Sequence, residues 1–224
     1  MGALGKLASE YIPKWFTPSK VDINIKPETS VKTQITTTTS TYEKAAKILG
    51  KGKTLDYGSG RGIGASVLDA DTFEPFAREG YNPTFTESNQ IPSNSYDNIT
   101  NLNVLNVVKP DARDAIVADI GRILKPKGTA IITTRGMDIF GNKSKMAKAA
   151  LGNEPRSIIT SAGTYQKGFT QNELKKYVSE ILGGDFSVST LKGLGKAGVK
   201  IKKLVDKWVT KVKSFLNLAM LHLD

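Results

Sequence analysis

The pattern of apolar positions along the middle of this chain alternates between short strand-like runs and helical spacing. Short β-branched or apolar runs predict strands at 53–57, near Phe73, at 84–86, at 96–104 and at 129–134. Helical spacing predicts helices at 42–49, 111–124 and 171–182, the last with Thr170 as its cap and Glu173 as the capping-box partner. Strands that alternate with helices in this way predict a doubly wound, mostly parallel α/β sheet.

The two ends of the chain lie outside this alternation. We interpret residues 1–40 as an N-terminal extension and linker, and residues 41–201 as the α/β domain, with an irregular insertion or lid at 135–168. Phe186–Leu191 and Val199–Ile201 can pair as a β-hairpin. An apolar stripe at helical spacing, with lysines on the other faces, predicts a basic amphipathic helix over residues 202–224.

A cluster of glycines follows the first predicted strand, in the order Gly58-Ser59-Gly60-Arg61-Gly62. Glycine tolerates positive φ and lets the backbone approach a ligand, and a helix that follows directs its amides toward that ligand. Glu74 ends the second predicted strand, and a carboxylate there can accept hydrogen bonds from both hydroxyls of a ribose. Nine residues separate Gly64 from Glu74, so the helix between the two strands has two turns at most.

The glycine loop, Glu74, the segment Tyr96–Val108 and the run Arg122–Gly128 resemble class I S-adenosylmethionine (SAM) methyltransferases in order and spacing. The resemblance covers residues 53–135. It implies a class I methyltransferase-like α/β fold, here with helical N- and C-terminal extensions, and SAM as the cofactor of a transferase.

The same resemblance assigns roles to individual residues. Asp56 and the glycine loop would hold the methionine part of SAM, with Asp56 near its ammonium. Glu74 would bind the ribose, Glu87 would lie near the adenine, and Asn101 with Asn103 would line the methyl-transfer end. The implied cofactor-binding residues are therefore Asp56, Gly58, Ser59, Gly60, Gly62, Glu74, Glu87 and Asn101.

No motif identifies a catalytic base, because methyl transfer from a sulfonium depends mainly on alignment of the acceptor. The candidates are Asn103, which could orient an amine or hydroxyl, Tyr165 in the loop 163–168 at the end of the insertion, and Arg135 at the end of the fifth strand. The sequence has no cysteine, which excludes disulfides and cysteine nucleophiles, and its one histidine is His222. We expect no metal site.

Positive charge is concentrated outside the glycine-loop region. The formal net charge is +11, yet residues 51–130 carry nine basic and ten acidic residues, whereas residues 192–224 carry eight basic and two acidic ones. This asymmetry favours a nucleic acid or an anionic membrane surface as partner. The alternative is that the positive charge serves only to keep the protein in solution. The predicted contacts are Lys202, Lys203, Lys207, Lys211 and Lys213, and the apolar stripe of the same helix could bind a partner protein.

Two other functions stay open. A methyltransferase-like protein could bind a ligand, nucleic acid or protein without catalysis. A NAD-dependent oxidoreductase is the second alternative, because the run from Gly60 matches G-x-G-x-x-A, although Glu74 then follows at 14 positions rather than the usual ~20. No apolar run approaches the ~20 residues of a membrane span, and no signal-peptide pattern is present, so we expect a cytoplasmic location.

Overall fold

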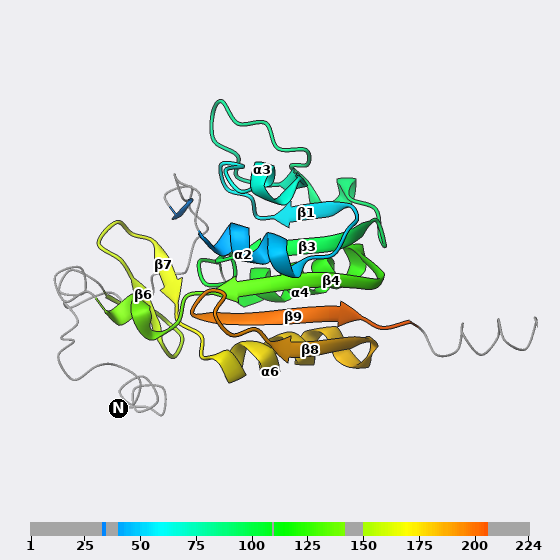
Figure 1. Cartoon of the computed structure of the whole chain (residues 1–224). Helices are drawn as coiled ribbons and strands as arrows, with labels where there is room; N and C mark the ends of the chain where they lie inside the picture. Colours follow the sequence, from blue (N-terminus) through cyan, green and yellow to red (C-terminus); the bar gives the residue numbers. More distant parts are fainter. Residues whose placement is uncertain (1–32, 35–39, 109, 142–149, 206–224) are drawn as a thin grey trace, which may run out of the picture.

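A six-stranded sheet forms the centre of the molecule (Figure 1). The computed structural model describes residues 33–34, 40–108, 110–141 and 150–205. The strands follow the order β2-β1-β3-β4-β9-β8. They span β1 Thr54–Tyr57, β2 Ala70–Phe73, β3 Tyr96–Leu102, β4 Leu124–Thr134, β8 Phe186–Thr190 and β9 Ala197–Lys203. Strands β1 to β4 are parallel, and β9 runs antiparallel to both of its neighbours, β4 and β8, which confirms the mostly parallel sheet.

Helices cover both faces of the sheet. Helices α4 (Pro110–Ile123) and α6 (Gln171–Leu182) bury Val117, Ile120, Leu174 and Val178 against one face. Helix α2 (Ser40–Ile48) packs on the opposite face, and α3 (Ala65–Leu68) is a single turn, as the short spacing before Glu74 predicted. Short 3₁₀ helices occur at η2 (Ser88–Gln90), η3 (Met137–Phe140) and η4 (Gly183–Asp185).

Helix α6 begins where the sequence predicted. The Thr170 side chain accepts a hydrogen bond from the Glu173 amide, and the Glu173 side chain accepts one from the Thr170 amide. This capping box satisfies two backbone donors that the helix itself leaves unpaired.

The alternation of side chains along β9 decides which of its residues are buried. Val199 and Ile201 join the core formed with α4 and α6. Lys200 pairs in register with Ile131 of β4, whose side chain packs with α2, so the intervening lysines of β9 lie on the α2 face. Among the described helices, α6 is the one that packs broadly on β8 and β9, and it does so from the other side.

The insertion after β4 is more regular than the sequence suggested. It contains a small antiparallel sheet of β5 (Ala150–Leu151), β6 (Ser157–Ile159) and β7 (Tyr165–Lys167). The prediction of an irregular segment was wrong. The segment forms a small sheet of its own, whose strands pair with one another rather than with the central sheet. Its role as a lid stays a prediction.

Two other predictions need correction. The strand expected at 84–86 is reduced to one parallel bridge between Phe85 and Phe73. The C-terminal helix cannot begin at residue 202, since β9 runs to Lys203. The rest of that predicted helix, at 206–224 with Lys207, Lys211 and Lys213, and the predicted N-terminal helix both lie outside the described residues.

Lys203 is also not on a basic helix face. Its ammonium donates hydrogen bonds to the carbonyl oxygens of Gly121 and Leu124 and to Asn94 Oδ1, at 2.8–2.9 Å. It therefore caps the end of α4 and is not an available contact for a polyanion. No helix in the described ranges has the length and apolar character needed to cross a bilayer.

Candidate functional site

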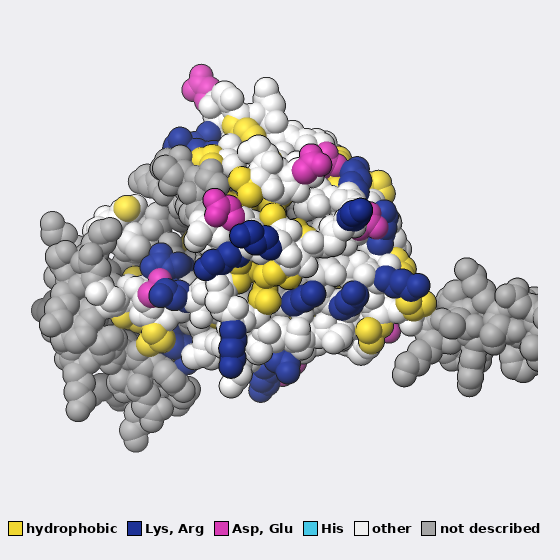
Figure 2. Space-filling model, in the orientation of Figure 1, with side chains coloured by type: hydrophobic (Ala, Val, Ile, Leu, Met, Phe, Trp, Pro, Cys, Tyr) yellow, Lys and Arg dark blue, Asp and Glu magenta, His cyan; other side chains and the backbone are white. Residues whose placement is uncertain are grey.

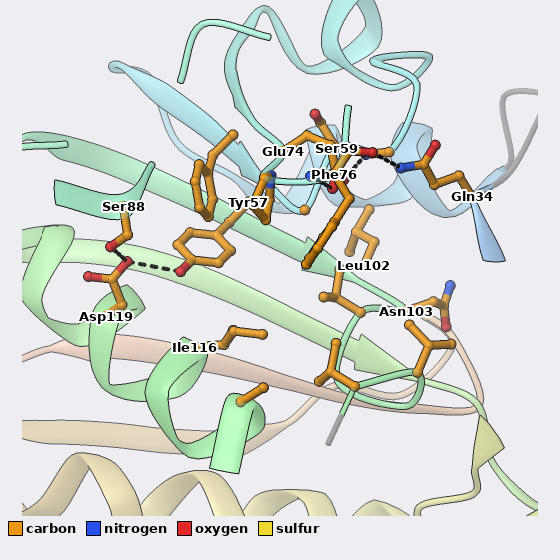
Figure 3. Close-up of a pocket in the computed structure, with 18 of the residues that line it drawn as sticks. Gln34, Tyr57, Ser59, Glu74, Phe76, Ser88, Leu102, Asn103, Ile116 and Asp119 are labelled. Atoms are coloured by element: carbon orange, nitrogen blue, oxygen red, sulfur yellow. Dashed lines mark hydrogen bonds between the residues drawn. The ribbon is translucent and has the colours of Figure 1, made fainter. Parts of the chain in front are cut away.

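A cavity of about 750 Å³ opens where β1, β2 and β3 end (Figure 3). This volume lies within the range of small-molecule sites, and the carboxyl edge of an open α/β sheet is where such folds bind ligands. The lining comes from the glycine loop, the segments after β2 and β3, one face of α4, the first turn of α2 and residues 33–34.

The glycine loop has the conformation that its composition predicts. Gly58, Gly60 and Gly62 have φ of 83°, 62° and 71°. The amides of Gly58 and Ser59 both donate to the Phe73 carbonyl, at 2.9 and 3.1 Å. A Cβ on Gly58 would come within 2.5 Å of Val104, so position 58 excludes any larger residue.

Glu74 follows β2 directly and lies in the cavity wall, near Ser59 and Phe76 (Figure 3). Its side chain is nearly buried, and its two carboxylate oxygens accept hydrogen bonds from different amides. Oε2 accepts from Gly60 N at 2.8 Å and Oε1 from Phe76 N at 3.0 Å. Burial raises the pKa of the Glu74 carboxyl, and these two hydrogen bonds oppose that rise.

A polar network closes the far end of the cavity. Asp119 of α4 accepts hydrogen bonds from Tyr57 Oη at 2.9 Å, Ser88 Oγ at 2.6 Å and Arg122 Nε at 2.7 Å (Figure 3). Sequence reasoning missed this network, because its members are scattered over 65 positions and Arg122 alone belongs to a motif that the sequence analysis used.

The wall between these two polar regions is apolar. After β3 it is formed by Val104, Val107 and Val108, and along α4 by Ala112, Ala115 and Ile116. Asn103 is the polar residue at the start of this wall, and it has a positive φ of 60°. The sequence did not reveal this wall either, since nothing local distinguishes its aliphatic residues from core residues.

Comparison with known proteins identifies the fold. No protein-family model and no curated protein matches the sequence. Among solved structures, the chain is similar to 1,6-didemethyltoxoflavin-N1-methyltransferase from Burkholderia thailandensis, with a TM-score of 0.54, 15% identity and coverage of 74% of this chain and 79% of that one. It is also similar to the PH0226 protein from Pyrococcus horikoshii OT3, with a TM-score of 0.53, 14% identity and coverage of 70% and 83%. The chain has a class I methyltransferase fold.

In this methyltransferase fold, half of the predicted cofactor residues line the cavity. Gly58, Ser59, Gly60 and Glu74 do so, whereas Gly62 faces the Tyr81 ring instead. Glu87 is exposed and precedes η2, and the neighbouring Ser88 lines the cavity in its place. Asn101 is buried behind the cavity and donates to the Tyr57 carbonyl at 2.9 Å. The ligand-binding roles of all eight stay predictions.

Asp56 lies beneath the glycine loop rather than in the cavity lining. It is 1% exposed, its Oδ1 accepts a hydrogen bond from Thr100 Oγ1 at 2.7 Å, and its Oδ2 has no partner within the described residues. Burial raises the pKa of the Asp56 carboxyl to about 7, although the Thr100 hydrogen bond opposes this. A positive charge brought near the loop would therefore stabilise the ionised form of the Asp56 carboxyl.

Of the three catalytic candidates, Asn103 alone lines the cavity of this methyltransferase fold. Arg135 follows β4 and forms a half-exposed ion pair with Asp138, with Nε and Oδ2 2.6 Å apart. Tyr165 lies on β7, is 1% exposed and donates its hydroxyl to Glu154.

Tyr165 belongs to a buried ionic cluster that joins the insertion to α4. Arg113 of α4 is 3% exposed, donates from Nε to the Leu105 carbonyl at 2.8 Å and forms a two-pronged ion pair with Glu154. The Lys167 amide of β7 donates to the Asn106 carbonyl at 2.8 Å. The insertion is thus fastened to the segment after β3 that provides the valine wall.

Residues 33–34 lie across the glycine loop. Gln34 donates from Nε2 to the Phe76 carbonyl at 3.0 Å and accepts from Arg78 Nε at 3.1 Å. A Cβ on Gly60 would stand 3.5 Å from the Gln34 side chain. Within the described part of the chain, no group of three or more His, Asp or Glu residues could hold a metal ion.

Proposed function

We propose that this chain is a SAM-dependent methyltransferase. The observation that carries the proposal is the meeting of the glycine loop and the Glu74 carboxylate at one cavity, within a class I methyltransferase fold. The similar Burkholderia thailandensis enzyme was crystallised with bound 1,6-didemethyltoxoflavin and S-adenosylhomocysteine. At 15% identity this likeness supports the fold, and the cofactor and activity of the present chain remain our proposal.

The residues present fit the cofactor. A carboxylate oxygen has two acceptor sites, so Glu74 can bind a ribose while it keeps its bonds to Gly60 and Phe76. Gly58 and Gly60 would let the backbone approach the methionine part, and Asp56 on β1, just before the loop, would favour its ammonium. Ser88 and the Asp119 network would bound the adenine end.

When bound, SAM supplies a methyl group already activated by a sulfonium. The chain itself has to orient the acceptor and exclude water. Asn103 offers an amide that can hold an amine or hydroxyl, and the valine and alanine wall beside it excludes water. A cytoplasmic location stays a prediction.

A methyltransferase-like binding protein without turnover is the second candidate. It is favoured by the positions of Tyr165 and Arg135, which leave Asn103 as the sole catalytic candidate in the cavity lining. Incubation of the purified chain with methyl-labelled SAM and fractionated cell extracts separates the two proposals. Label transferred to any fraction supports the enzyme, whereas SAM binding without transfer supports the binding protein.

Calorimetric titration with SAM, S-adenosylhomocysteine and NAD tests the site directly. We expect the two SAM-type ligands to bind and Glu74→Gln to weaken them roughly 10- to 100-fold, as for loss of a charged hydrogen-bond acceptor. The matched control is Glu79→Gln, an exposed glutamate in the segment that follows, which should leave affinity unchanged. Binding of NAD in preference to SAM would establish the oxidoreductase reading instead.

A further inference from the structure

Six exposed or half-exposed lysines gather on the face of the molecule that carries α2. Figure 2 shows Lys and Arg side chains collected over α2 and the β8–β9 hairpin on this face. Two of the lysines belong to α2, two to the turn between β8 and β9, and two to β9. We call this set the lysine band: Lys44, Lys47, Lys192, Lys196, Lys200 and Lys202.

One exposed acid, Glu43 of α2, lies beside the band, next to Lys44 and four residues before Lys47. Residues 186–205 contain five lysines and no Asp or Glu. None of the ion pairs formed among the described residues uses a lysine of the band. Next to Lys200 and Lys202, the same face of β8 presents the hydroxyls of Ser189 and Ser187. The surface over β8 and β9 is therefore both cationic and polar, and half-buried apolar residues at the end of α2 and in the turn, Ile48, Leu49 and Leu191, lie beside it.

The band reaches the edge of the sheet at which the cavity opens. Thr41 and Tyr42 of α2 line the cavity, and Lys44 follows on the same helix. The Lys44 ammonium contacts the Gly193 carbonyl at 3.3 Å, which joins α2 to the turn between β8 and β9. Ala197 pairs with Thr134, the last residue of β4, so Lys196 also stands at this edge.

We infer that the lysine band binds the phosphate backbone of a single-stranded nucleic acid, which presents a base to the cavity as the methyl acceptor. The presentation of a base as methyl acceptor rests on the proposed methyltransferase function, whereas the binding of the phosphate backbone does not. Lys200 and Lys202 are two residues apart on one strand, about 7 Å, and their lysine and serine neighbours suit phosphate and sugar contacts. A base stacked in a duplex reaches such a cavity only if it is flipped out, at a cost of a few kcal/mol, so a single strand is the favoured substrate.

The same features argue against a membrane as the occupant. Peripheral attachment combines basic residues with apolar side chains that enter the interface. The positions of β8 and β9 that lie on the α2 face of the sheet hold serine, lysine and glycine instead. Leu204 and Val205 are the exposed large apolar residues nearest the band, and both lie beyond the end of β9.

The test is fluorescence-anisotropy titration of the full chain with labelled single-stranded RNA and DNA of about 20 nucleotides, long enough for a typical single-strand site. If four lysines each engage one phosphate, log K falls with log salt at a slope near −2.8, about 50-fold weaker binding between 50 and 200 mM salt. Lys200→Gln with Lys202→Gln should reduce the slope to about −1.4.

The matched control is Lys175→Gln with Lys176→Gln, which removes two exposed charges from α6 on the opposite face. Equal losses in both double variants would show diffuse charge attraction and overturn the proposal. Absence of binding at 50 mM salt, or tighter binding to phosphatidylserine vesicles than to either oligonucleotide, would also overturn it. Failure of SAM to bind in calorimetry refutes the methyltransferase and leaves band-dependent oligonucleotide binding standing, so the two failures are distinguishable.

Discussion

Replacement of Glu154 by alanine should destabilise the fold severely, because it leaves the Arg113 guanidinium buried without its counter-ion. Arg113 is 3% exposed and would keep its bond to the Leu105 carbonyl and a long one, of 3.4 Å, to the Tyr165 hydroxyl, but no anionic partner. Breaking a buried ion pair by removing one partner costs about 3–5 kcal/mol, a large share of the 5–15 kcal/mol that stabilises a typical domain. In a chain of this length that cost lowers Tm by roughly 6–20 °C.

Urea unfolding followed by circular dichroism measures the effect as a lower midpoint with an unchanged slope. The control is Glu180→Ala, which removes the partner of an exposed ion pair with Lys176 and should cost about 0.5 kcal/mol or less. A loss below about 1 kcal/mol for Glu154→Ala would refute the reasoning, since Arg113 would then have found water or another acceptor.

The effect of Glu154→Ala should also depend on pH in a defined direction. Burial opposes ionisation of Glu154, but the hydrogen bonds and charge of Arg113 outweigh it and hold the pKa of this carboxyl below its usual range. A depressed folded-state pKa stabilises the protein above the unfolded-state pKa of about 4.3. The difference between the wild-type chain and the variant should therefore shrink as pH falls below that value.

Two further substitutions test other parts of the structure. Asp56→Asn should stabilise the fold by up to about 4 kcal/mol at pH 8 and by almost nothing at pH 4, because the pKa of about 7 means that stability is lost as pH rises from about 4 to 7. Thermal melts at both pH values check this, and an equal gain at both would contradict it. Thr170→Ala should cost about 1 kcal/mol through loss of the α6 cap, and an unchanged urea midpoint would count against the capping box.

Local chemistry explains why much of the fold could be predicted. The Thr170–Glu173 box, Pro110 at the start of α4 and the β-branched run at 129–134 each specify an element through residues a few positions apart. The glycine loop and Glu74 lie at one cavity because two short parallel strands bring their ends together, and their roles toward a ligand stay predictions.

What could not be predicted depends on contacts between distant parts of the chain. Tyr165 was interpreted as a loop residue near the reacting atoms, yet it pairs with Glu154 and Arg113, which lies 52 positions away. The predicted start of the C-terminal helix was wrong for a different reason. Apolar residues at 199 and 201 fit a strand, and those at 201, 204 and 205 fit a helix. Pairing with β4 and β8 decided for the strand through Lys203.

The hydrogen bonds from the insertion to the segment after β3 divide the site into two separately replaceable parts. The glycine loop and Glu74 are encoded before residue 75, whereas the valine wall is held in place by Arg113, Glu154 and the amide of Lys167. Evolution can therefore exchange the insertion, and with it the shape of the wall, without touching the residues on the cofactor side. For protein engineering, residues 150–168 are the segment to graft or randomise when a new acceptor is sought.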